Sequence, residues 1–140
     1  LDHLLQQVKT GPNKSDVMFV VCNVYSKKRY FTAAIDFCER TLDLAPKKIE
    51  VMNRLAWLYA KKGIKIERGL ALIQEVIEVH PKKAKYIDTL AELLFAKGEI
   101  AGAVQNINKA ISLEPGNAFY KQQLWKFNNV PVTPLNTLQN

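Results

Sequence analysis

The chain has 140 residues, of which 48% are hydrophobic and 24% charged, and its 20 basic and 13 acidic residues leave a net charge of +7. This composition is typical of one folded domain with a core and excludes a disordered chain, and two cysteines are too few for a disulfide scaffold. Short apolar runs and two widely separated histidines predict no membrane insertion in this segment and disfavour most metal and nucleophilic sites.

Four prolines recur along the chain at nearly equal intervals. Pro12, Pro46, Pro81 and Pro115 are separated by 34, 35 and 34 residues. Each follows one helix-like apolar pattern and precedes another, as expected for a proline just beyond a helix end. A fixed period of this length indicates a repeat architecture, so we predict three units over residues 15–48, 49–83 and 84–117.

Ahead of the first unit, residues 1–12 carry Leu1, Leu4, Leu5 and Val8 on one helix face. In the register of the prolines, this segment is the second helix of a repeat whose first helix is missing. The pattern therefore predicts a leading half repeat, and with it that the chain is a fragment of a longer repeat protein.

Each of the three units divides into two helices of about 13 residues with a turn between them. The first helix has apolar residues at i, i+3, i+4 and i+7, which form one buried stripe. Small residues recur at fixed positions of both helices, which predicts that antiparallel helices approach closely there. These small residues are Cys22, Ala56 and Ala91 in the first helices and Ala34, Gly69 and Ala103 in the second helices.

The turns inside the units differ from one another. Gly63 and Gly98 stand where a left-handed residue can end a helix without steric cost. Arg29 takes that place in the first unit, so we expect its turn to be closed differently. One extra residue between Gly63 and Gly69 accounts for the longer second unit.

A further helix is predicted over residues 117–128, after the third unit. Its aromatic residues would cover the apolar face that the last repeat otherwise leaves in water. Residues 129–140 contain two prolines, no charges and no periodicity, which predicts an extended tail.

The combined spacing of residues 1–128 resembles the tetratricopeptide repeat (TPR) family. The sequence departs from the family pattern at the first motif position, which lacks tryptophan, and at Thr41 and Val76, which replace a small residue like Ala110. The resemblance implies an all-α fold: a right-handed superhelical solenoid of antiparallel helix pairs, with about three full repeats, a leading half repeat and a C-terminal capping helix.

The resemblance also implies that the first helices line a concave groove that binds a peptide or protein. Trp57 and Phe95 interrupt the polar side of their helices, so they either anchor a ligand or pack on a neighbouring or terminal helix. Asp16 and Glu50 begin this side of the first two helices, and Thr89 lies on it in the third. The candidate groove residues are Phe19, Asn23, Lys27, Asn53, Arg54, Trp57, Lys61, Lys85, Asp88, Glu92 and Phe95.

Some TPR proteins grip the C-terminal carboxylate of heat-shock chaperones with five clamp residues. Asn23 and Lys85 match that clamp, whereas Phe19, Arg54 and Thr89 replace its Lys, Asn and Arg. Binding of chaperone tails is therefore disfavoured. A peptide with an acidic or carboxylate feature still suits the basic groove residues.

Other chemistry-bearing residues have simpler explanations. Cys22 and Cys38 lie at packing positions, where two buried reduced thiols are expected, with a disulfide as the alternative. Asp88 and Glu92 lie four residues apart with Lys85 nearby, which predicts a solvated ion-pair cluster rather than an acid–base site. Paired lysines occur at turns on opposite edges of the repeat, which disfavours nucleic acid as a partner.

The predicted function is a non-catalytic module that binds an unidentified protein or peptide, as part of a larger protein or assembly, without cofactor or metal. The alternative is a structural solenoid that links domains or forms a homo-oligomer through its ends or its tail. Reduced cysteines would favour the cytoplasm.

Overall fold

The computed structural model describes residue 2 and residues 14–129 of the chain. The predicted half repeat over residues 1–12 and the tail after Asn129 lie outside this described part. Residues 14–129 form helices with no strand between them. The helices are α2 (Lys14–Lys27), α3 (Phe31–Leu44), α4 (Ile49–Lys62), α5 (Ile66–Val79), α6 (Ala84–Lys97), α7 (Ile100–Leu113) and α8 (Ala118–Asn129).

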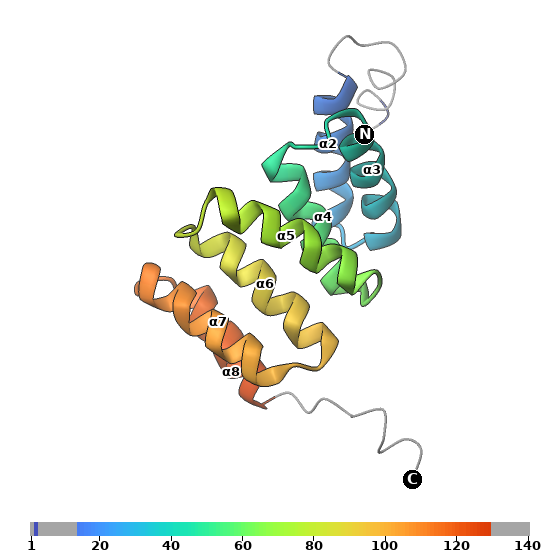
Figure 1. Cartoon of the computed structure of the whole chain (residues 1–140). Coiled ribbons are helices and arrows are strands. Elements are labelled where there is room, and N and C mark those ends of the chain that lie inside the picture. Colours follow the sequence, from blue (N-terminus) through green and yellow to red (C-terminus); the bar gives the residue numbers. More distant parts are fainter. Residues whose placement is uncertain (1, 3–13, 130–140) are drawn as a thin grey trace.

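The helices stack in chain order, from α2 and α3 at one end to α7 and α8 at the other (Figure 1). Short turns pair α2 with α3, α4 with α5, and α6 with α7, so each pair is antiparallel. The first helices also pack directly on each other where α4 meets α6. The all-α solenoid predicted from the repeat spacing is confirmed.

The buried stripe of each first helix follows the predicted period. Met18, Val21 and Cys22 of α2 are at most 1% exposed, and Met52, Leu55 and Ala56 of α4 are at most 2% exposed. One core cluster extends from α2 to α6 and a second from α6 to α8, and Leu94 packs against both. Each pair therefore buries its apolar face partly against its neighbours, as a stacked repeat requires.

Gly69 shows why small residues recur in the second helices. A Cβ atom at this position would lie 2.7 Å from Cδ2 of Leu93 and 3.6 Å from the carbonyl oxygen of Ala56. α5 therefore approaches α4 and α6 more closely at this point than a larger side chain allows. Ala34 and Ala103, at the equivalent positions, are fully buried.

The three turns inside the pairs close in one way, which corrects the expectation for Arg29. Arg29 itself adopts the left-handed conformation with φ of 63°, as Gly63 and Gly98 do with 74° and 92°. In each turn the next backbone N–H donates to the carbonyl oxygen five residues earlier: Tyr30 to Tyr25, Ile64 to Tyr59 and Glu99 to Leu94. The hydrogen bonds of the helix end thus impose the geometry even where a side chain makes it costly.

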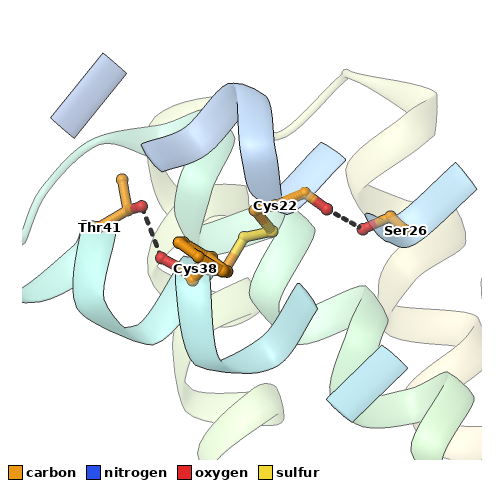
Figure 2. The surroundings of a disulfide bond; sticks show 5 residues. Cys22, Ser26, Cys38 and Thr41 are labelled. Atoms are coloured by element: carbon orange, nitrogen blue, oxygen red, sulfur yellow. Dashed lines mark hydrogen bonds between the residues drawn. A yellow bond between two sulfur atoms is a disulfide. The ribbon is translucent and has the colours of Figure 1, made fainter. Parts of the chain in front are cut away.

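Cys22 of α2 and Cys38 of α3 form a disulfide (Figure 2). Their Cα atoms are 5.5 Å apart, within the range that a disulfide spans, and both residues are fully buried. The prediction of two reduced thiols is therefore wrong. Both cysteines do lie at packing positions, but those positions face each other across the pair, where Ala56 and Ile73 stand in the next repeat. The cysteine argument for a cytoplasmic setting does not hold either.

Two buried hydroxyls beside the disulfide are satisfied within their own helices (Figure 2). Ser26 donates to the carbonyl oxygen of Cys22 at 2.8 Å, and Thr41 donates to that of Phe37 at 2.6 Å. Thr41 is fully buried at a position where the third repeat has alanine. The local hydrogen bond explains why the polar residue is tolerated in the core.

Candidate binding surface

The eleven candidate residues lie on the first helices α2, α4 and α6, and we refer to them together as the first-helix surface. Lys27 and Lys85 are exposed, and Asp88 and Glu92 are buried. The others are half-buried, which leaves part of each side chain accessible. These are Phe19, Asn23, Asn53, Arg54, Trp57, Lys61 and Phe95.

Asn23 and Asn53 each have an unpaired polar atom on this surface. The side-chain oxygen Oδ1 of both residues is buried, and no hydrogen-bond partner for it is found among the described residues. A buried amide oxygen without a partner costs on the order of 1–3 kcal/mol, so native proteins rarely leave one. Two of them on adjacent first helices suggest a surface that needs hydrogen-bond donors from outside.

Trp57 is held between aromatic and cationic groups. The ring of Phe31 meets its indole edge-on, with ring centroids 6.1 Å apart. The guanidinium of Arg54 lies 5.3 Å from the indole centroid, and the ammonium of Lys61 lies 5.4 Å from it. Trp57 is therefore a half-buried aromatic platform with two cations close to its ring.

Arg54 has no ion pair within the described part of the chain. Partial burial lowers the pKa of its guanidinium, because removal of water disfavours the charged form. The described structure pairs neither Lys27 nor Lys85 with an acid, although Lys85 lies 5.2 Å from the ring centroid of Tyr86. Arg54, Lys27 and Lys85 would therefore favour the binding of an anionic ligand at this surface.

Asp88 and Glu92 do not form the solvated cluster that the sequence predicted. They are only 6% and 4% exposed, and side chains of α8 contact both of them. Glu92 accepts hydrogen bonds from Lys61 of α4 at 3.1 Å and Lys126 of α8 at 2.9 Å. Gln123 of α8 donates to Glu92 and also to Asp88, at 3.1 Å. The cluster therefore joins three helices instead of facing water.

The two carboxyl groups respond in opposite directions to this environment. Burial raises the pKa of Asp88 to about 6, and the nearby charge of Glu92 adds to the rise, although Gln123 opposes it. Burial would also raise the pKa of Glu92, but the charges of Lys61 and Lys126 and the hydrogen bond from Gln123 lower it overall. At neutral pH both carboxylates are ionised, and ionisation costs more free energy at Asp88 than at Glu92.

Phe95 packs on the terminal helix, the second of the two roles that its sequence position allowed. Its ring stacks on that of Phe127 with centroids 4.8 Å apart, and Phe127 is 2% exposed. Gln123 and Lys126 were missed in the sequence because their helix was expected to contribute only aromatic residues. Their spacing of three, next to Phe127, was the available signal for a polar stripe facing α6.

The chemistry of this surface is hydrogen bonding, stacking and ion pairing. Residues 14–129 contain no group of three or more His, Cys, Asp or Glu side chains arranged to hold a metal ion. Within the same part of the chain, every helix is too short or too polar to traverse a bilayer.

Comparisons with known proteins place this arrangement among helical repeats. The sequence profile described as "Tetratricopeptide repeat" matches residues 84–117. No curated protein sequence matches the chain.

Solved structures give many matches. Residues 41 to the end of MamA from Desulfovibrio magneticus RS-1 superpose with a TM-score of 0.78 and 16% identity, over 91% of this chain and 71% of that one. The first TPR domain of Spaghetti (RPAP3), bound to the HSP90 peptide SRMEEVD, gives 0.69 and 19%, over 91% and 94%. The Sgt2 TPR domain from Aspergillus fumigatus gives 0.69 and 20%, over 88% and 89%. Residues 84–117 thus match the tetratricopeptide repeat in sequence, and the described chain shares the fold of tetratricopeptide repeat domains.

Proposed function

We propose that the chain is a non-catalytic module that binds an extended segment of a partner protein across the first-helix surface. The observation that carries this proposal is the pair of buried, unpartnered amide oxygens on Asn23 and Asn53. An extended segment offers backbone N–H donors and C=O acceptors along its length, so it can satisfy a side-chain amide in either orientation.

The charges on this surface favour a segment with an acidic side chain or a terminal carboxylate. Arg54 is half-buried, and Lys27 and Lys85 are exposed, each without an ion pair among the described residues. A carboxylate beside Arg54 would form a charge-assisted hydrogen bond, roughly twice as strong as a neutral one. Trp57, next to Arg54, would then pack against the adjoining part of the segment.

The ligand in the Spaghetti (RPAP3) structure is an HSP90 peptide, but the residues here favour a different segment. The chaperone-tail clamp matches this chain only at Asn23 and Lys85. Thr89, in place of the clamp arginine, is 2% exposed and donates to the carbonyl oxygen of Lys85 at 3.1 Å. It has no further proton to offer a carboxylate.

A pull-down from the native lysate with an affinity-tagged chain tests the proposal. The variant Trp57→Ala with Arg54→Glu should lose the bound protein, because it removes the stacking platform and reverses the half-buried charge of Arg54. The matched control Lys109→Glu reverses an exposed charge on α7 and should retain that protein. Equal recovery by all three chains would show that the partner binds elsewhere.

Self-association is the second candidate, and the outer face of α8 favours it. Phe119 is 49% exposed and Trp125 is 66% exposed, unlike the buried Tyr120 and Phe127 of the same helix. Large exposed aromatic residues often mark a protein contact. Light scattering at high concentration would show a dimer for the wild type and a monomer for Trp125→Ser; a monomer for both would exclude this contact.

A further inference from the structure

A surface hollow lies at the turn between α2 and α3, beside the end of α4. It has a volume of about 750 Å³, and residues 29–33 line it together with Asp36 and Lys62.

 Tyr30 on its wall is 60% exposed, and Phe31 is half-buried. Sites that enclose small molecules bury most of the ligand, so this open, aromatic-walled hollow suits a side chain of another protein better.

Cations without ion pairs surround this turn hollow. Lys28, Arg29 and Lys62 are exposed, and none of them pairs with an acid among the described residues. The one acid in the lining, Asp36, lies 3.5 Å from Arg40 on its own helix. The net charge around the hollow is therefore positive, which complements an acidic partner.

Arg29 occupies a position where the other two turns have glycine. It holds a left-handed backbone conformation that a side chain makes costly, and its guanidinium carbon lies 5.2 Å from the ring centroid of Phe31. The cation is thereby fixed at the rim of the hollow, over an aromatic residue. Such a placement is unnecessary for closing the turn, since Gly63 and Gly98 close theirs with the same hydrogen bonds.

On this edge, the uncompensated positive charge does not extend beyond the α2–α3 and α4–α5 turns. On the next turn along the same edge, Lys97 pairs with Glu67 at 2.9 Å and with Glu99 at 3.5 Å. A nucleic acid or an anionic membrane would need a longer uncompensated stripe. The limited extent of the charge, centred on an apolar hollow, matches a short protein segment.

We propose that the turn hollow is a second docking site, which adjoins the first-helix surface where Phe31 meets Trp57, for an acidic protein segment that inserts an apolar or aromatic side chain. The carboxylates would lie near Arg29 and Lys62, and the inserted side chain would contact Tyr30 and Phe31.

An NMR titration of the ¹⁵N-labelled chain tests this proposal. The probe is the blocked peptide Glu-Glu-Asp-Leu-Phe-Asp-Glu-Glu, and its matched control replaces every acid by the corresponding amide. Backbone signals of Tyr30, Phe31 and Ala33 should shift at about 1 mM acidic peptide, the affinity range of a weak surface contact. The amide control should shift them much less.

Two variants test whether the positive charges at the rim of the hollow contribute to binding of the acidic peptide. Arg29→Gly introduces the residue that the other two turns have at this position, and Lys62→Gln changes an exposed side chain. Both chains should therefore fold. Together they should weaken binding of the acidic peptide about fivefold, as expected for two surface charges. Arg54→Gln, on the first-helix surface, should leave binding at the hollow unchanged, which separates this proposal from the proposed function.

Several results would overturn the inference. These are the absence of shifts at the turn hollow, equal shifts with the amide control, shifts confined to the first-helix surface, and unchanged affinity in the double variant. Tighter binding of single-stranded DNA or of phosphatidylglycerol vesicles at the same signals would assign the hollow to a different class of partner.

Discussion

The two ends of the described solenoid are built on one packing scheme but are held together by different chemistry. At the α2–α3 end, the disulfide between Cys22 and Cys38 joins the two helices in the core. At the other end, α8 is joined to α6 through the buried carboxylates of Asp88 and Glu92. The repeat period therefore specifies where helices meet, whereas the individual residues decide whether a covalent bond, a polar cluster or apolar contact holds them.

Removing the disulfide should have the largest effect on stability. In Cys22→Ala with Cys38→Ala, the link across a sequence separation of 16 is lost, and loop-closure entropy of that size is worth about 3 kcal/mol. Chemical denaturation should show this loss in the variant, and a reductant should produce a similar loss in the wild type alone. A wild type with two titratable thiols and no response to reductant would contradict the assignment.

Disrupting the polar cluster of Asp88 and Glu92 at the other end should cause the next largest loss of stability. Glu92→Ala removes the shared acceptor of Lys61 and Lys126, which are 23% and 30% exposed and so retain some water. We expect a loss of about 2 kcal/mol, less than for a fully enclosed pair. Glu78→Ala on exposed α5 surface is the control and should change little. Similar unfolding midpoints for both variants would argue that α8 docks through its aromatic residues alone.

Asp88 should give the same end a distinct pH dependence. Its pKa is raised from 3.8 to about 6 in the folded chain, so the native state binds more protons than the unfolded state between these values. This carboxyl therefore reduces stability as the pH rises from about 4 to 6, and Asp88→Asn should be more stable at pH 7 by about 1–2 kcal/mol. Unfolding measured across this range should show a difference between the chains that vanishes below about pH 4. A constant difference would contradict the titration.

The smallest expected effect concerns the turn at the disulfide end. Arg29→Gly relieves the left-handed strain but loses the contact with Phe31, which leaves a net gain of about 0.5 kcal/mol. Arg29→Ala keeps the strain and loses the contact, so it should be less stable than the wild type. The order Gly, Arg, Ala in thermal unfolding is the expected result. A glycine variant less stable than the alanine variant would be inconsistent with the turn geometry.

The periodic features of the molecule could be predicted from the sequence. The proline spacing located the helix pairs, and the apolar stripe that includes Met18, Met52 and Ile87 located the buried faces. Residues that recur at the same position indicate packing directly, because equivalent residues make equivalent helix contacts in every unit. The candidate binding residues came from the resemblance to tetratricopeptide repeats, whose groove positions were mapped onto the first helices in the same register.

Features that depend on contacts between distant residues were harder to anticipate. The bond between Cys22 and Cys38 requires knowing that two packing positions face each other, and the burial of Glu92 depends on how α8 lies against α6. Arg29 was misjudged because the local preference for glycine was taken as a requirement, whereas the hydrogen bonds at the helix end override it. The unpaired oxygens of Asn23 and Asn53 are visible only in three dimensions.

The side-chain amides of Asn23 and Asn53 give the most direct test of the binding surface. Their ¹H–¹⁵N signals should be followed by NMR while the captured partner segment is added. Both should shift, because the account requires that each amide gains a hydrogen-bond partner on binding, while the signal of exposed Asn108 on α7 stays in place. Unchanged Asn23 and Asn53 signals with shifts along α5 and α7 would contradict the proposed mode of binding.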